Sequence, residues 1–212
     1  MALLHQTTMS PTKLELFAAW LPTQPWFAGD ATQLVNLGSY RLDDPAGEVG
    51  LEGVLLSAGD ATVYHVPVTF RDAPLEVADG FSLGTSEHGV LGTRWVTSGV
   101  ADPVFREQLA AVIAEGGRQA DLMVQDAEGN MSTRDPLVLA QGTGRPGETV
   151  PNMEDASVEE VGSRSRIENG TAVLDIVRVV DETLQAADDQ LALEATWREQ
   201  PAPVVLALLY AG

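Results

Sequence analysis

The spacing of apolar residues predicts two amphipathic helices with a run of strands between them. The first helix is expected to begin with Ser10 as N-cap and Pro11 at its first helical position, and to end at Pro22. The second is expected to begin at Asp102-Pro103 and to end at Gly116-Gly117. Their predicted apolar faces consist of Leu14, Phe17, Ala18 and Leu21 in the first helix, and of Val104, Phe105, Leu109, Val112 and Ile113 in the second.

The residues between the helices read as strands joined by short turns. Runs at residues 34–41, 48–56 and 62–70 are separated by turns rich in Gly, Asp and Pro, which is typical of an antiparallel meander. Pro67, inside the third run, predicts an edge strand or a bulge, because proline cannot donate a ladder hydrogen bond. The stretch from Leu83 to Phe105 continues the sheet as two strands around Glu87-His88-Gly89.

The pattern changes after Gly117. Residues 122–130 and 136–140 are short strand candidates. Residues 141–160 carry Gly, Pro and acidic residues and almost no apolar ones, which predicts an exposed loop. Further strands are expected at residues 171–180, 190–197 and 204–210. The predicted fold class is α+β, with a curved antiparallel sheet and packed helices over residues 1–117, followed by a smaller, mostly-β subdomain over residues 118–212.

Composition argues against several classes of function. The chain of 212 residues has 12 basic and 31 acidic residues, a net charge of -19, which disfavours contact with nucleic acid or an anionic membrane surface. It has no cysteine, so disulfides, thiolate catalysis and Cys-based metal sites are excluded. The N-terminus lacks a signal-peptide pattern and no apolar run is long enough to span a bilayer, so we expect a cytoplasmic protein.

Three local patterns invite a chemical interpretation, and each has a simpler alternative. Gly142, Gly144 and Gly147 match GxGxxG, but the helix that a phosphate site requires is not predicted after them. Ser86-Glu87-His88 has the residue types of a hydrolase site, but neighbouring side chains of an extended chain point to opposite faces. The three histidines, His5, His65 and His88, lack the close spacing of metal ligands, although a site of His65, His88 and Glu87 stays open.

Several segments resemble, in the same order, the N-terminal cap region of actinobacterial maltokinases, which phosphorylate maltose with ATP. The segments are LPTQPWFAG (Leu21 to Gly29), RLDDPAGEVGLE (Arg41 to Glu52), YHVPVTFRDAPL (Tyr64 to Leu75), and GTSEHGVLGTRWV with ADPVF (Gly84 to Phe105). The resemblance covers roughly residues 10–115. It implies a cystatin-like cap, a curved antiparallel sheet with helices.

The resemblance continues more weakly into the region that supplies the kinase N-lobe in that family. There it implies that Asp175 occupies the position of the ATP-binding lysine, where an acid would repel phosphate. The chain has a single lysine, Lys13, and neither an HxD-type catalytic loop nor a metal-binding Asp motif before it ends at Gly212. We therefore expect no kinase activity and assign no catalytic, cofactor-binding or metal-binding residue.

The expected function is that of a non-catalytic, cap-like protein acting through protein contacts. The resemblance points to an enzyme of trehalose, maltose or glucan metabolism as the partner, such as a trehalose synthase or a kinase, and exposed strand edges near Pro67 and at residues 204–210 would suit strand addition or a homodimer. A carbohydrate or small-molecule binding module and a kinase fragment that retains nucleotide binding are the alternatives. Residues proposed as a structural or interaction signature are Trp26, Phe27, Glu87, His88 and Trp95, and the proposed stacking platforms are Trp26, Phe27, Trp95 and Trp197.

Overall fold

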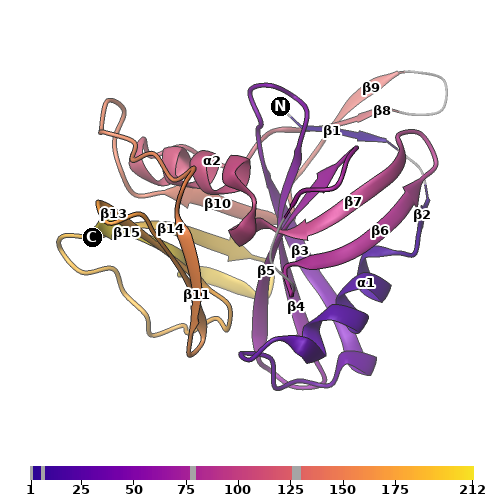
Figure 1. The fold of residues 1–212 in the computed structure, drawn as a ribbon, viewed down its shortest axis with the longest axis horizontal. Helices are drawn as coiled ribbons and strands as arrows, with labels where there is room; N and C mark the ends of the chain where they lie inside the picture. Colours follow the sequence, from indigo (N-terminus) through magenta and orange to yellow (C-terminus); the bar gives the residue numbers. More distant parts are fainter. Residues whose placement is uncertain (1, 6–7, 77–79, 126–129) are drawn as a thin grey trace.

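The computed structural model describes residues 2–5, 8–76, 80–125 and 130–212, which form two α-helices and three sheets (Figure 1). The first sheet contains, in spatial order, β2 (Met9–Ser10), β6 (Ser82–His88), β7 (Gly92–Ser98), β5 (Val63–Arg71), β4 (Gly50–Ala58) and β3 (Leu34–Leu42). The second contains β10 (Val138–Gly142), β14 (Leu191–Trp197), β15 (Gln200–Ala211), β13 (Ala172–Val177), β12 (Arg164–Glu168) and β11 (Ser157–Val161). The small sheet contains β1 (Ala2–His5), β8 (Leu122–Gln125) and β9 (Met131–Arg134).

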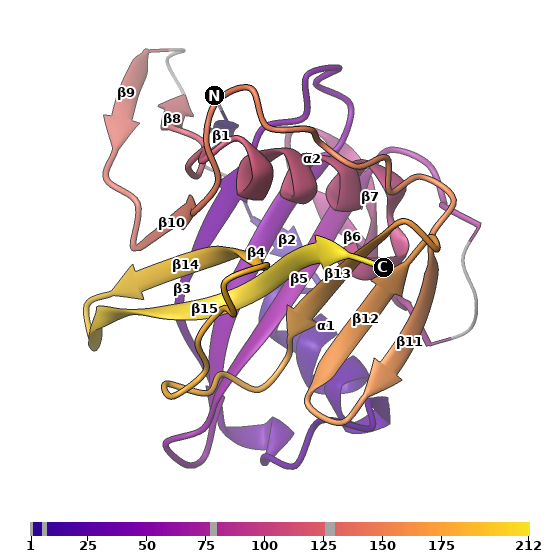
Figure 2. The ribbon, with the colours of Figure 1, turned by 90° about the vertical axis from the view of Figure 1, so that its left-hand side faces the viewer.

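The first sheet is antiparallel and curled, with a helix on each face. Helix α1 (Lys13–Trp20) buries Leu16, Phe17 and Trp20 against one face. Helix α2 (Pro103–Ala114) lies on the other face, between the two sheets (Figures 1 and 2). The prediction of a curved antiparallel sheet with two helices, followed by a second β subdomain, is confirmed, and the molecule as a whole is mostly β.

The start predicted for the first helix is wrong by two residues. Thr12 is the N-cap, and a reciprocal pair of bonds with Glu15 forms a capping box. Ser10 cannot cap the helix because its backbone belongs to β2, where it pairs with Glu87. The predicted apolar position Leu14 is exposed, and the face that packs on the sheet starts at Leu16 instead.

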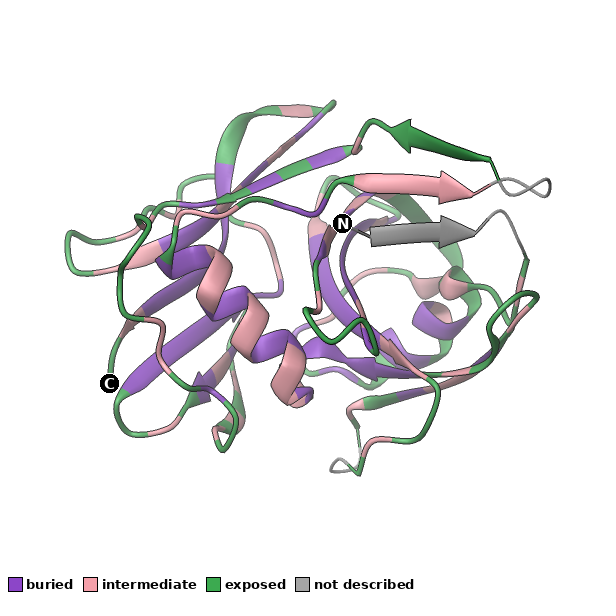
Figure 3. Cartoon of the chain, turned by 90° about the horizontal axis from the view of Figure 1, so that it is seen from above, coloured by how far each residue is buried: buried purple, intermediate pink, exposed green. Residues whose placement is uncertain are grey.

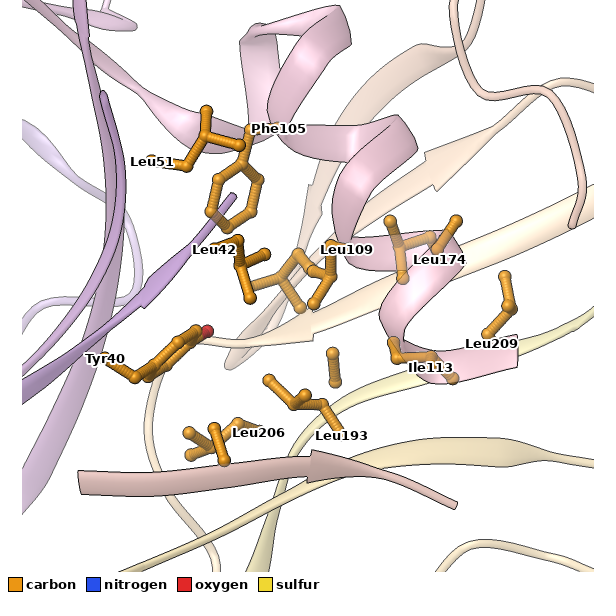
Figure 4. Close-up of a cluster of buried hydrophobic side chains, with 14 of the residues drawn as sticks. Tyr40, Leu42, Leu51, Phe105, Leu109, Ile113, Leu174, Leu193, Leu206 and Leu209 are labelled. Carbon is orange, nitrogen blue, oxygen red and sulfur yellow. The ribbon is translucent and has the colours of Figure 1, made fainter. Parts of the chain in front are cut away.

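Helix α2 begins as predicted, with the Asp102 side chain accepting from the N–H of Val104 and Pro103 in the first turn. Phe105, Leu109 and Ile113 point into a core shared by both sheets (Figure 4). The labelled core residues are Tyr40, Leu42 and Leu51 from the first sheet and Leu174, Leu193, Leu206 and Leu209 from the second. The domain boundary predicted at residue 117 stays a prediction, and the apolar core is continuous across it.

A glycine inside β4 lets a large side chain lie across the sheet. Gly53 pairs with Tyr40 of β3, and a Cβ at Gly53 would lie 2.2 Å from Cζ of that ring. The absence of a side chain allows the Tyr40 ring to lie over β4 towards His65 of β5, whose ring centre is 5.8 Å away. Gly53 therefore determines where the Tyr40 hydroxyl sits.

The two sheets are joined along β5. Residues 68–71 of β5 pair with β7, whereas the N–H of His65 donates to the carbonyl of Arg178 at 2.9 Å. The chain beyond β13 thus continues along the part of β5 that β7 does not reach, with Tyr64 bridged to Val179. The interpretation of Pro67 as an edge or bulge position is wrong, because β5 is an interior strand. Pro67 lies between the part of β5 that pairs with β7 and the part that pairs with the chain after β13.

The strand predicted at residues 204–210 is also interior. It belongs to β15, which pairs with β13 on one side and with β14 on the other. Its hairpin with β14 is tighter than predicted, since Trp197 pairs with Gln200 across Arg198 and Glu199. Neither edge that we expected to accept a partner strand is therefore open.

The region between the sheets contains more regular structure than the sequence indicates. The small sheet pairs β1 with β8 in parallel and β8 with β9 in antiparallel orientation, and in Figure 3 it stands to one side of the main body. Residues 143–156 form no strand or helix, and most of them are exposed, although Met153 is fully buried. The predicted strand at residues 122–130 runs into residues 126–129, which lie outside the described residues.

Candidate functional site

Glu87 and His88 lie at the end of β6 and support the turn to β7. The hydroxyl of Thr93 donates to Glu87 at 2.7 Å. The N–H groups of Val90 and Leu91 donate to Nδ1 of His88 at 3.3 and 3.1 Å, so this nitrogen carries no proton. The structural role predicted for this pair stays a prediction, and these bonds give it a physical basis.

Ser86 does not join them in a catalytic arrangement. Its buried hydroxyl donates to the carbonyl of Pro11 at 2.7 Å, on the side of the sheet that carries α1. Since side chains alternate along a strand, Glu87 faces the opposite side. A Ser–His–acid site requires the three groups to meet, and here the serine and the acid are separated by the sheet.

The aromatic residues proposed as platforms are mostly core residues. Trp26 is 5% exposed and Trp197 is 7% exposed, so neither presents a ring face to a ligand. The half-buried Phe27 packs on Tyr64 with ring centres 4.9 Å apart. Trp95, at 36%, is the most exposed tryptophan of the four, and Trp20 is buried beside Trp26.

Arg178 is fully buried where the sheets meet. Its Nε donates to the hydroxyl of Ser165 at 2.6 Å and its Nη2 to that of Ser98 at 3.1 Å. The guanidinium carbon lies 5.1 Å from the ring centre of Trp26. Burial lowers the pKa of this guanidinium to about 10, opposed by the charge of Glu160, whose carboxylate lies 4.0 Å from Nη2. One side chain thus connects Ser98 of the first sheet, Ser165 of the second sheet and the ring of Trp26.

His65 is the second buried polar group at this junction. Its Nδ1 lies 3.1 Å from the carbonyl of Val177, which can only accept, so Nδ1 carries the proton. Nε2 then accepts from the hydroxyl of Tyr40 at 2.9 Å. Burial, aided by the charge of Arg178, lowers the pKa of His65 to about 3, so this histidine is neutral. Its environment is that of a hydrogen-bonded core residue.

Asp175, the residue that the resemblance aligned with the ATP-binding lysine, is nearly buried and fully engaged. Arg166 donates to its two oxygens at 3.0 and 3.3 Å, and the hydroxyl of Tyr210 donates to Oδ2 at 2.9 Å. Arg164 adds a weaker ion pair at 3.8 Å. Both oxygens of this acidic side chain are therefore already occupied by partners.

The Gly142-x-Gly144 loop packs against the end of α2. The N–H of Gly144 donates to the carbonyl of Ile113 at 3.0 Å, and that of Arg145 donates to Ala114 at 2.9 Å. Cβ atoms at Gly142 and Gly144 would lie 2.0 Å from carbonyl oxygens of the helix. These glycines therefore let the loop satisfy the C-terminal carbonyls of α2, and no helix begins after them.

Trp95 lies on the face of the first sheet that α2 shares with the second sheet. It pairs with Arg71 of β5 on one side and with Thr85 of β6 on the other. The guanidinium of Arg71 is fixed by two bonds of 2.8 Å to the buried carboxylate of Asp102, which raise the pKa of Arg71. The neighbouring row contains Thr93 opposite Glu87. This part of the face therefore presents an exposed indole among hydrogen-bonded polar side chains.

Metal binding and membrane insertion can be examined only over the described part of the chain. There, no three His, Cys, Asp or Glu residues gather in a way that could hold a metal ion. His65 and His88 have separate partners, and the side chain of His5 is not described. No helix among those residues is long and apolar enough to cross a membrane.

The sequence signals for the buried junction were available but were not recognised. Asp175 and Arg178 interrupt an otherwise apolar strand, and Gly53 interrupts another. An ionisable residue in such a run indicates either a partner or a function, because an unpaired buried charge is costly. Their partners Ser98, Ser165 and Tyr40 come from distant segments, which spacing along the sequence does not reveal.

Part of the chain matches the model of a protein family. Residues 20–102 match the family model of the maltokinase N-terminal cap domain, which confirms the resemblance over β3 to β7 and up to the N-cap of α2. The second sheet lies outside the matched range. A comparison of the chain with curated proteins found no match.

Proposed function

We propose that this chain is a non-catalytic, cap-like interaction module that binds an enzyme of trehalose, maltose or glucan metabolism, such as a trehalose synthase or a kinase. The cap match over residues 20–102 supports the metabolic context. We further propose that the first sheet forms a cystatin-like α+β cap and that the protein is cytoplasmic. Contact with a protein, rather than turnover of a substrate, is the activity assigned to it.

The observation that carries the non-catalytic part of the proposal is the environment of Asp175. A nucleotide site of the kinase type places a lysine against the phosphates, because a cation must neutralise them. Here the aligned position holds a carboxylate that already has Arg166 and Tyr210 as partners. Freeing those partners to meet a phosphate would leave a nearly buried charge without compensation.

The continuity of the two sheets supports a scaffold role. Helix α2 contributes Phe105, Leu109 and Ile113 to a core that residues of both sheets complete. A platform with one core presents its surface without a large change of shape on binding, which lowers the ordering cost of association. The net charge of -19 favours a partner with a basic surface and predicts that contact weakens as salt is added.

The edges that could accept a partner strand differ from those predicted. Both β5 and β15 are interior, whereas β11 and β9 are edge strands. All four residues of β9 are exposed, while β11 carries Glu159 and Glu160. We propose that any homodimer or strand addition uses one of these two edges.

The direct test is association of the purified chain with purified trehalose synthase and with purified maltokinase. Size-exclusion chromatography with light scattering should show a complex with at least one of these enzymes, and this complex should weaken at high salt. The same measurement reports whether the free chain is a monomer or a dimer. A monomer that binds neither enzyme at low salt would remove the main support for the proposal.

The non-catalytic part has a separate test. Adding ATP and magnesium should leave the melting temperature of the wild-type chain unchanged, because a ligand stabilises only a protein that binds it. The near-isosteric variant Asp175→Asn is the matched control, since it removes the negative charge with little change of shape. A rise of several degrees in the wild type would contradict the proposed role of Asp175.

A further inference from the structure

On one face of the first sheet, the described residues cover one half and leave the other half partly exposed. Helix α2 and the second sheet pack over β3, β4 and the first part of β5, where they bury Tyr40, Leu51 and Leu55. Strands β6 and β7 extend away from them (Figure 1). On this open part the indole of Trp95 is 36% exposed, while the other three tryptophans are 5–7% exposed.

The side chains around Trp95 form an ordered polar frame. Thr85 is directly opposite on β6, and Arg71 is directly opposite on β5. In the adjacent row, Thr93 is bonded to Glu87 at 2.7 Å. Cross-strand neighbours lie about 5 Å apart. The row of Thr93 and Glu87 lies about 7 Å further along the strands. The hydroxyls and the carboxylate therefore lie on the same face as the indole, within reach of the hydroxyl groups of one pyranose unit.

In this frame the cation is paired, and the carboxylate of Glu87 adds a negative charge. Arg71 is held by both oxygens of Asp102 at 2.8 Å, and Glu87 accepts from Thr93. The chain carries a net charge of -19, so an anionic ligand would be repelled at long range. A neutral ligand with its own hydroxyl groups fits this surface better than a phosphorylated or acidic one.

We propose that Trp95, with Thr85, Thr93 and Glu87, binds the pyranose ring of a neutral carbohydrate. The apolar C–H face of the sugar stacks on the indole, which supplies most of the buried apolar area. Hydroxyls at the rim of the sugar bond to the two threonines and to Glu87, which provide orientation. Arg71 acts as a positioning residue, because its bonds to Asp102 hold it beside the indole.

This site is independent of the proposed protein contact. It requires neither trehalose synthase nor a kinase, and either proposal can fail without the other. The ligand can be a free disaccharide or one unit of a longer glucan, and both present the same ring to Trp95. The dependence of the affinity on the length of the sugar distinguishes these two ligands, since a glucan that extends along β6 and β7 gains contacts that a disaccharide lacks.

The test follows the indole N–H signals of the ¹⁵N-labelled chain by NMR. Trp95→Phe identifies its signal by loss of one peak, and the buried Trp20, Trp26 and Trp197 serve as internal controls. Glucose, maltose, trehalose and maltoheptaose are the probes, titrated to about 10 mM because shallow sites bind small ligands weakly. Inositol, a polyol without a pyranose oxygen, is the matched control ligand.

We expect a saturable shift of the Trp95 signal with at least one pyranose probe and no shift of the other three. Trp95→Ala should lose this binding at least tenfold, with a far-UV circular dichroism spectrum unchanged. Thr85→Val and Thr93→Val, which keep the side-chain shape, should each weaken sugar binding several-fold. These two variants keep the proposal testable even if Trp95→Ala folds poorly. Binding that persists in all three variants, or no shift with any of the sugars, would overturn the proposal.

Discussion

The two halves of one face of the first sheet have different chemistry and different neighbours. The covered half carries Tyr40, Leu51, Leu55 and His65, and α2 and the second sheet exclude water from it. The open half carries Trp95, between threonines and an ion-paired arginine. In both halves the side chains point alternately to the two sides of the strands, so the halves do not differ in secondary structure.

This difference shows how the fold assigns roles to polar residues. In the covered half Tyr40 of β3 bonds to His65 of β5, and His65 in turn bonds to the carbonyl of Val177 in the second sheet. In the open half Thr93 bonds to Glu87 of the same hairpin, and Arg71 is held by Asp102 at the start of α2. The bond from His65 to Val177 joins the two sheets, whereas the pairs of the open half lie within the first sheet and its connection to α2.

The largest effect is expected from Arg178→Ala at the junction. Removing the guanidinium takes away the donor to the hydroxyls of Ser98 and Ser165, leaves Ser165 with Glu160 alone, and opens a cavity beside Trp26. We expect a loss of roughly 3–5 kcal/mol in the free energy of unfolding. Urea denaturation followed by circular dichroism measures it.

Arg178→Met provides the matched comparison, because it keeps most of the volume without the charge. It should recover at least half of the lost stability, since buried ions can often be replaced by apolar groups. Arg198→Ala, at an exposed position of the β14–β15 turn, should change little. If Arg178→Ala were no more costly than Arg198→Ala, the junction would not hold the sheets together.

The next effect is a dependence on pH through His65. Its pKa is about 3 in the folded chain and about 6.5 when unfolded, so between these values the unfolded chain binds the extra proton. Stability present above pH 6.5 is therefore lost as the pH falls, by about 2 kcal/mol from pH 7 to pH 5. Urea denaturation at a series of pH values measures the slope.

The control for this slope is His65→Gln, which retains hydrogen-bonding groups and does not titrate. The difference between the two slopes isolates His65 from His5 and His88. Burial raises the pKa of Glu52, but the charges of Arg41 and Lys13 outweigh this effect and lower the pKa to about 2. The stability that Glu52 contributes is also lost as the pH falls, but only below about pH 4.5. Parallel slopes for wild type and His65→Gln above pH 5 would show that His65 is not held neutral.

A smaller effect is expected from Tyr40→Phe. The variant keeps the ring over Gly53 and removes the hydroxyl that donates to Nε2 of His65 at 2.9 Å. An acceptor left without its donor in the core costs roughly 1–2 kcal/mol. Thermal denaturation should show a lower melting temperature, and an unchanged value would mean that another donor reaches Nε2.

Much of the fold could be predicted because its signals are local. The Asp102-Pro103 start of α2, the meander of β3 to β5 and the β6–β7 hairpin depend on caps, turns and alternation within a few residues. The first helix was misplaced at Ser10 because two local signals compete there. Thr12 with Glu15 offers a second cap, and the pairing of Ser10 with Glu87 decides between them.

The site could be predicted only in part, because it depends on which faces become covered. Trp26, Phe27, Trp95 and Trp197 are equivalent as aromatic residues in the sequence, and packing alone separates the exposed Trp95 from the buried Trp26 and Trp197. The edge predicted at Pro67 is wrong because residues after β13, far along the chain, lie beside β5 where β7 does not reach. Such long-range contacts leave no periodic signal.

The smallest effects on stability are expected in the open half. Trp95→Phe keeps an aromatic ring on a partly exposed surface, and Thr93→Val removes one exposed hydrogen bond to Glu87. Each should change the free energy of unfolding by no more than about 0.5 kcal/mol, as surface substitutions usually do. Urea denaturation under the conditions used for Tyr40→Phe makes the two halves directly comparable. A cost for Trp95→Phe as large as that of Tyr40→Phe would show that the indole is a structural support, so that its exposure reflects packing and not an available binding surface.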